Sequence, residues 1–121
     1  MSRRPLPPGA IAMSSYFLPL GPRTAFDAGA PHKAGLVRGA RLFAGLDCLE
    51  PGQSRRVHVH ADGEKFYLVL SGKARIAVGG EAAVAEAGTL VWAPAGVPHG
   101  VLEALERTVL LVAMAPPPGG D

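Results

Sequence analysis

The sequence predicts an all-β fold, built as a small antiparallel β-barrel or sandwich from many short strands. The chain has 12 prolines in 121 residues, yet none lies between Pro51 and Pro94. Because proline cannot donate to a sheet ladder, a proline-free stretch rich in β-branched residues and bounded by glycine and proline indicates paired strands. Short turn signals recur along this stretch, and no segment has the length of a convincing helix. We therefore expect the middle of the chain to form the sheet core.

Nine strands are expected between these turn signals. Gly79-Gly80 predicts a hairpin turn, since adjacent glycines supply the positive φ angles of tight turns. The segment 81–87 has a helix-like composition, but seven residues between glycines are too few, and a strand is expected there. Gly45 inside a strand predicts a bulge or a close approach of backbone. The expected strands are Ala10–Leu18, Arg41–Leu49, Arg55–His60, Phe66–Leu70, Lys73–Val78, Ala82–Ala85, Thr89–Ala93, Gly100–Leu105 and Thr108–Ala113.

The composition indicates one globular domain over residues 1–121. Hydrophobic residues make up 48% of the chain and charged residues 18%, which is ample for one core. Residues 1–10 and 115–121 are rich in proline and glycine, and we expect both ends to be mobile. The larger apolar side chains are expected mainly in the core. These are Phe43, Phe66, Tyr67, Trp92 and Met114.

Charge and hydropathy argue against nucleic-acid and membrane partners. The net charge is +2, but the 12 basic residues are scattered, with no run longer than two. No stretch approaches the roughly 18 consecutive apolar residues of a membrane span, and prolines near the N-terminus interrupt any signal-peptide core. The single cysteine, Cys48, is expected to be a buried thiol, and its lack of a disulfide partner fits a cytoplasmic location.

Two of the four histidines, His58 and His60, lie on one predicted strand. Residues i and i+2 of a strand point to the same face, so both imidazoles project side by side. Neutral imidazole is the commonest protein ligand of several transition metals, and this pair is either a two-ligand clamp or a solvated surface pair. His32 lies among turn residues and is expected to face solvent.

The residues around this pair resemble the two sequence motifs of the cupin superfamily. The motifs are G-x5-HxH-x3,4-E-x6-G and G-x5-PxG-x2-H-x3-N. The matching residues are Gly52, His58, His60, Glu64 and Gly72 for the first, and Gly88, Pro94, Gly96 and His99 for the second. The resemblance implies a jelly-roll barrel, or double-stranded β-helix, that holds one divalent metal ion (Fe, Mn, Ni, Zn or Cu). It assigns the metal ligands to His58, His60, Glu64 and His99.

Two positions depart from the family pattern. Seven residues, not six, separate Glu64 from Gly72, and counting back six from Gly72 leads to Lys65. Either a one-residue bulge turns Glu64 toward the metal, or the strand presents Lys65, whose ammonium has no lone pair to offer. Glu64 is therefore predicted as the fourth ligand, with a three-histidine site as the alternative. Glu103 stands where the second motif has asparagine, a position that is not usually a ligand.

Two functions remain open from the sequence. The resemblance implies a metal-dependent enzyme that acts on a small organic molecule, by an oxygenase, isomerase or decarboxylase reaction, with no catalytic acid or base assignable. The alternative is a non-catalytic module that binds a small ligand in the barrel; Lys65, Arg55 and Arg56 would suit an anionic one if they face the cavity. We also expect a homodimer, because the apolar segment Ala10–Leu18 predicts an edge strand that needs covering.

Overall fold

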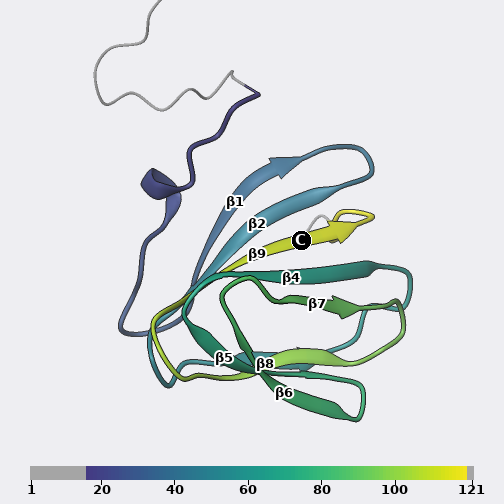
Figure 1. Cartoon of the computed structure of the whole chain (residues 1–121). Helices are drawn as coiled ribbons and strands as arrows, with labels where there is room; N and C mark the ends of the chain where they lie inside the picture. The colour runs from purple at the N-terminus through teal and green to yellow at the C-terminus, as the bar shows by residue number, and fades with distance from the viewer. Residues whose placement is uncertain (1–15, 120–121) are drawn as a thin grey trace, which may run out of the picture.

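The computed structural model describes residues 16–119 as two antiparallel sheets wrapped into a barrel (Figure 1), which confirms the predicted all-β fold. A single 3-10 turn, η1 (Gly21–Arg23), precedes the sheets, and no helix in this part of the chain could cross a membrane. In chain order the strands are β1 (His32–Arg38), β2 (Phe43–Leu49), β3 (Arg55–His58), β4 (Glu64–Ser71), β5 (Lys73–Val78), β6 (Glu81–Glu86), β7 (Leu90–Ala93), β8 (His99–Ala104) and β9 (Thr108–Ala115).

The chain winds back and forth between the two sheets. The larger sheet has the order β1-β2-β9-β4-β7, and the smaller has the order β3-β8-β5-β6. After β2 the chain crosses to β3 in the smaller sheet and returns as β4. It then crosses to the hairpin β5–β6, returns as β7, crosses again as β8 and ends in the larger sheet as β9. The winding makes neighbours of segments far apart in sequence, such as β2 beside β9 and β3 beside β8.

Eight of the nine expected strands are present, with bounds that differ by a few residues. The expected strand Ala10–Leu18 lies mostly outside the described residues, as does the expected mobile end 1–10, and residues 16–18 are not a strand. The prediction of turn residues around His32 was wrong: His32 begins β1 and is half-buried. Gly35 and a bulge between Gly35 and Val37 interrupt the alternating pattern of β1, which hid the strand from sequence analysis.

The interior between the sheets is filled by alternate residues of the strands. Tyr67, Val69, Leu110 and Ile76 pack there with less than a twentieth of their surfaces exposed. A second cluster lies on the outer face of β1, β2 and β9, under the segment that precedes β1. Cys48 is fully buried in this second cluster, as predicted. Trp92 was expected in the core, but it is 49% exposed because it sits on the outward-facing row of β7.

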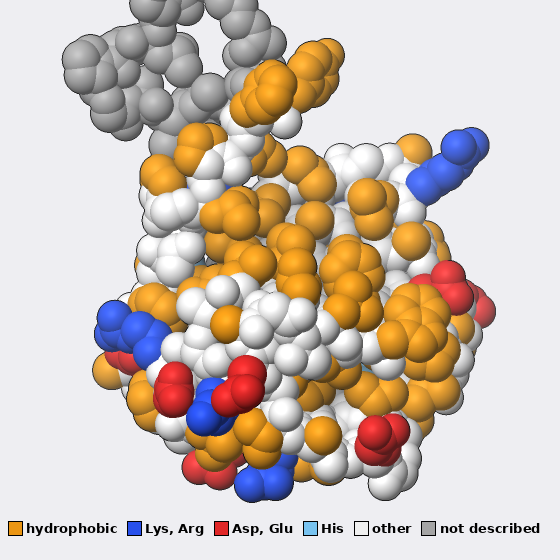
Figure 2. Space-filling model, in the orientation of Figure 1, with side chains coloured by type: hydrophobic (Ala, Val, Ile, Leu, Met, Phe, Trp, Pro, Cys, Tyr) orange, Lys and Arg blue, Asp and Glu red, His pale blue; other side chains and the backbone are white. Residues whose placement is uncertain are grey.

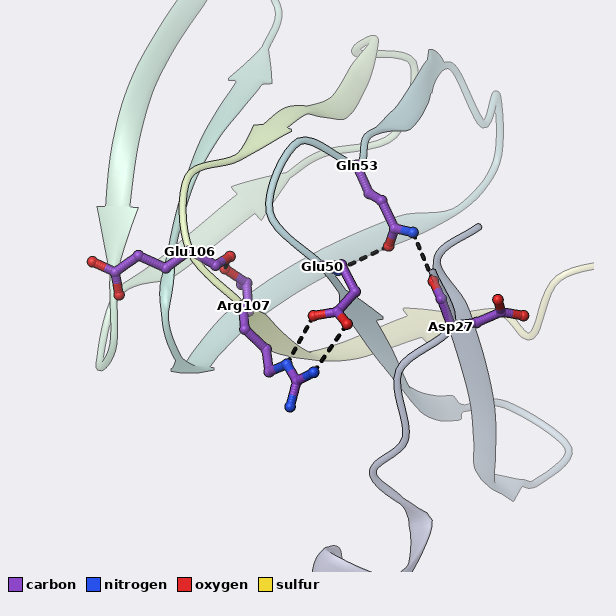
Figure 3. Close-up of polar contacts among 6 residues, drawn as sticks. Asp27, Glu50, Gln53, Glu106 and Arg107 are labelled. Carbon is purple, nitrogen blue, oxygen red and sulfur yellow. Dashed lines mark hydrogen bonds and ion pairs between the residues drawn. The ribbon is translucent and has the colours of Figure 1, made fainter. Parts of the chain in front are cut away.

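A group of polar contacts closes one end of the barrel (Figure 3). Arg107, between β8 and β9, donates two hydrogen bonds to the carboxylate of Glu50, of 2.8 and 2.9 Å, and its guanidinium stacks on Phe26. Gln53 donates to the Asp27 carbonyl oxygen and accepts from the Glu50 amide. These contacts tie the loop after β2 to the β8–β9 turn and to the segment before β1.

The motif glycines occupy backbone conformations that other residues rarely adopt. Their φ angles are all positive: Gly52 (88°), Gly72 (87°), Gly88 (90°) and Gly96 (77°). Gly72, in the tight turn between β4 and β5, is the most restricted, because a Cβ there would overlap the Arg107 carbonyl oxygen. The β4–β5 turn and the β8–β9 turn therefore meet only if residue 72 has no side chain.

We expect Gly72→Ala to lower the free energy of unfolding by at least about 2 kcal/mol, since it combines a positive φ with a backbone clash. Urea denaturation measures this. Gly80→Ala is the matched control: Gly80 has no positive φ, and no described atom lies within 4 Å of the position that a Cβ would take, so a change within about 0.5 kcal/mol is expected. Equal losses in the two variants would contradict the close approach at Gly72.

The Glu50–Arg107 pair predicts a pH-dependent loss in Arg107→Gln. The hydrogen bonds from Arg107 lower the pKa of Glu50 below its usual 4.5, so the pair adds stability above that pH and loses it as the pH falls. The gap in stability between the native protein and Arg107→Gln should be small at pH 7, because Arg107 is exposed and Glu50 is partly exposed, and should narrow further below pH 4.5. Urea denaturation of both proteins at pH 7 and at lower pH measures this difference. If the difference in stability did not change with pH, the contribution of Arg107 would come from its contact with Phe26 alone.

Candidate metal centre

Three histidines meet at the opposite end of the barrel from these contacts. His58 is the last residue of β3, His99 is the first residue of β8, and the two are direct partners in the antiparallel pair. His60 follows two residues after His58. The ring centroids lie 4.7 Å apart for His58–His60, 4.7 Å for His58–His99 and 5.5 Å for His60–His99.

The backbones of β3 and β8 approach closely beside these histidines. A Cβ on Gly100 would lie 2.7 Å from the Val57 Cα, so only glycine permits this spacing. The neighbouring residues, His58 and His99, are thereby brought face to face. Gly100 is a positioning residue that the sequence analysis did not single out, although a glycine directly after the second-motif histidine was a visible signal.

Backbone carbonyl groups fix the orientation of two of the rings. The Nδ1–H of His58 donates to the Arg56 carbonyl oxygen at 2.8 Å, and the Nδ1–H of His99 donates to the Val97 carbonyl oxygen at 3.0 Å. A carbonyl oxygen can only accept, so each Nε2 carries a free lone pair. The Nε2 of His99 is buried and has no hydrogen-bond partner among the described residues. An unpartnered buried acceptor is costly, and a bound cation would satisfy it.

The surroundings of His60 and His99 favour the neutral, metal-binding form of these two imidazoles. Burial lowers the pKa of His99, and the nearby Lys65, His58 and His60 lower it further against the opposing effect of the Val97 hydrogen bond. Burial also lowers the pKa of His60, again with help from His58 and Lys65. A metal ion needs the lone pair of a neutral ring, so the lowered pKa values of His60 and His99 favour metal binding.

The two candidates for a fourth position lie on opposite faces of β4. Glu64 is exposed, whereas Lys65 is only 7% exposed and its Nζ lies 4.8 Å from the centroid of the Tyr67 ring. The pairing of β4 with β9 is continuous from Glu64 to Val69, and its one irregularity comes between Val69 and Ser71. Alternation along the continuous part turns Lys65 and Tyr67 inward and Glu64 outward. The strand therefore presents Lys65, not Glu64, to the histidines.

A cavity of about 180 Å³ opens beside the histidines. Arg55 and Asp47 face each other in its wall, with 3.8 Å between the Arg55 Nε and an Asp47 carboxylate oxygen. Burial lowers the pKa of Lys65 to about 8, partly offset by Asp47. Asp47 was not singled out from the sequence, although a carboxylate in the apolar strand Phe43–Leu49 was the available signal. The polar residues of the lining are Lys33, Asp47, Arg55, His58, His60 and Lys65, and the apolar ones include Phe43, Val112, Met114 and Pro118.

The donor set of this centre could hold a divalent metal ion. The ligand nitrogens of His58, His60 and His99 all lie within 4.8 Å of one another. Metal–imidazole bonds of about 2.0–2.1 Å place tetrahedral ligands roughly 3.3 Å apart, so small side-chain rotations would bring the three nitrogens to one ion. The buried Nε2 of His99, which has no hydrogen-bond partner among the described residues, is a second observation that fits a bound metal ion.

Comparisons with known proteins agree with this geometry. A family model described as a cupin domain matches residues 45–114. An uncharacterized protein of Streptomyces coelicolor is 36% identical over 81 residues, which are 67% of this chain and 76% of the relative. A solved structure from Thermus thermophilus is 35% identical, with a TM-score of 0.79 and coverage of 84% of this chain and 98% of that one. An RmlC-like cupin from Desulfovibrio desulfuricans is 28% identical, with a TM-score of 0.72 and coverage of 78% and 90%.

The family match spans more than half of the chain and contains all three histidines. Its range also includes β3 to β8 and most of β2 and β9, and thus most of both sheets. This chain belongs to the cupin family, and its fold is a double-stranded β-helix.

Proposed function

We propose that this cupin binds one divalent transition metal ion through His58, His60 and His99 and acts as a metal-dependent enzyme on a small organic molecule. The observation that carries the proposal is the buried Nε2 of His99, which has no partner among the described residues and lies in one cluster with the lone pairs of His58 and His60. Oxygenation, isomerisation and decarboxylation are the reaction classes that such a site could serve. The site and these three reaction classes are proposed, but no single reaction, because one fold can host many different reactions.

The chain's own residues supply the setting for such chemistry. His58, His60 and His99 would hold the ion, which would supply Lewis-acid chemistry when bound. The carbonyl groups of Arg56 and Val97 hold His58 and His99 in the required tautomer and orientation. Tyr67, whose ring centroid lies 6.2 Å from that of His99, and Met114 give the barrel interior beside the cluster an apolar lining. Lys65 lies over the Tyr67 ring and places its amino group near His60 and His99, whose pKa values it helps to lower.

A non-catalytic ligand-binding module is the second candidate, and the charged cavity favours it. Arg55 and Lys65 line the space next to the histidines and would hold an anion whether or not a metal is present. Ligand binding after metal removal separates the two candidates: the enzyme proposal requires a bound metal, whereas the module would bind its ligand equally well without one.

The metal site predicts a specific thermal shift. Full-length protein purified without added metal should contain close to one equivalent of a first-row transition metal by elemental analysis. After chelation, re-adding the metal at a hundredfold excess over its Kd should raise the melting temperature by roughly 10 °C. His99→Ala and His60→Ala should abolish the shift, while His32→Ala, in β1, should retain it.

Glu64→Gln tests the fourth-ligand prediction in the same assay. We expect metal affinity within about twofold of the native protein, because the Glu64 side chain is exposed on the outward face of β4. A loss of about tenfold or more would show that the strand turns Glu64 inward on binding. A native protein with no metal and no thermal shift with any first-row ion would overturn the metal-site proposal itself.

We further propose that the protein is a homodimer that uses the outer face of β4 and β7 in the larger sheet, beside the part of that face that the segment before β1 covers. Figure 2 shows hydrophobic side chains spread over this face. Two apolar rows cross it, in which Phe66 pairs with Trp92 and Leu68 pairs with Leu90. Leu90 is 56% exposed and Trp92 is 49% exposed, and such contiguous apolar surface marks an interaction site.

Light scattering should give a mass of twice 12.5 kDa at micromolar concentration. Trp92→Lys should shift the protein toward the monomer, because it buries a charge in the interface. Arg75→Glu, on the smaller sheet, is a surface control and should leave the dimer intact. A native protein that is monomeric at this concentration would contradict the proposal.

A further inference from the structure

We infer that the cavity beside the histidines binds a small organic carboxylate, which is recognised by Lys33, Arg55 and Lys65. The inference rests on the proposed function, because the cavity shares His58 and His60 with the metal centre, and it names the substrate class of that site. It is carried by the convergence of three cations, from three strands of both sheets, on one cavity whose described lining contains a single carboxylate.

The three cationic side chains of the cavity differ in their exposure to solvent. Lys33, on β1, is exposed at the rim and lies directly opposite Asp47 of β2. The Arg55 side chain, on β3, is 26% exposed. Lys65, on β4, is 7% exposed and lies over the Tyr67 ring. An anion that enters from solvent therefore meets positive charge along the whole depth of the cavity.

The positive charge of this lining exceeds the negative charge. Among the described residues, Asp47 is the one acidic member of the lining, and its carboxylate is 3.8 Å from the Arg55 Nε. Within residues 16–119, no carboxylate lies within 4 Å of the Lys65 Nζ. A buried ammonium without a paired anion is unfavourable. A carboxylate bound in the cavity would neutralise the charge of Lys65 and remove this cost.

The shape of the cavity limits what the anion can be. Its volume of about 180 Å³ lies below the roughly 300–1,000 Å³ of sites for drug-sized ligands, so the occupant is small. The planar guanidinium of Arg55 matches a planar carboxylate. Phe43, Val112 and Met114 form an apolar wall. This wall suits a carbon chain, whereas an inorganic phosphate would lose its water of hydration against it. A short organic carboxylate satisfies all three features.

A matched pair of arginine variants tests this inference. Arg55 and Arg56 are adjacent on β3, but Arg56 is exposed and absent from the cavity lining, so each variant removes the same charge from a different place. Binding of acetate, lactate, succinate and inorganic phosphate to the full-length protein is measured by calorimetry at constant ionic strength, with its metal and after chelation. We expect at least one carboxylate to bind more tightly than phosphate, and Arg55→Gln to weaken it at least about tenfold. Arg56→Gln should change its affinity by less than about twofold.

Lys65→Met provides the second variant, because it preserves the volume of the buried side chain. We expect it also to weaken the carboxylate about tenfold without lowering the melting temperature. An unchanged affinity with a lower melting temperature would make Lys65 a structural residue and overturn its role.

Three further outcomes would overturn the inference: no carboxylate bound by the native protein, equal losses in Arg55→Gln and Arg56→Gln, or phosphate bound as tightly as the carboxylates. None of these outcomes touches the metal content measured for the proposed function. Conversely, binding of a carboxylate to the metal-free native protein but not to metal-free Arg55→Gln would support the inference even if the metal proposal failed.

Discussion

The antiparallel pairing of β3 with β8 is the constraint on which the site depends. It places His58 directly opposite His99, and the absence of a side chain at Gly100 lets the two backbones approach closely enough for the rings to meet. Because β3 and β8 are separated by four other strands along the chain, this pairing is a long-range contact that depends on the winding between them. The histidine cluster is thus a product of the global topology, even though His58 and His60 are neighbours in sequence.

The alternation of β4 decides the charge of the site. Counting residues from His60 and from Gly72 led to two different positions, and the long-range pairing of β4 with β9 selects Lys65 as the inward one. A cupin with a carboxylate at this point presents a mixed nitrogen and oxygen donor set. Here Lys65 takes that place, so three imidazoles are the donors that the described residues gather at the centre, and cations outnumber carboxylates in the lining of the neighbouring cavity. The charged residues of the cavity, and not only the three histidines, therefore set the chemical character of this site.

Much of the fold was predictable because strands and turns are encoded locally. Proline-free runs between glycines located eight strands, and the spacing of the two motifs brought His99 to His58 and His60. The strand β1 was missed because a bulge breaks its period. Lys33 and Asp47 were missed for a different reason: they become neighbours of Arg55 and Lys65 only through cross-strand registers, which no local pattern records. Trp92 faces outward although its size favours burial, because the face of a strand residue is set by register.

The polar contacts among Glu50, Gln53 and Arg107 lie at the end of the barrel away from the histidines. Together with the turn at Gly72, they secure the closed end through groups that take no part in the cavity. The contacts that stabilise the fold and the residues that line the cavity therefore lie at different ends of a very small protein. Such a division makes the scaffold evolvable: residues at the open mouth can be exchanged one at a time to suit new ligands, while the closed end preserves a folded barrel through each intermediate step.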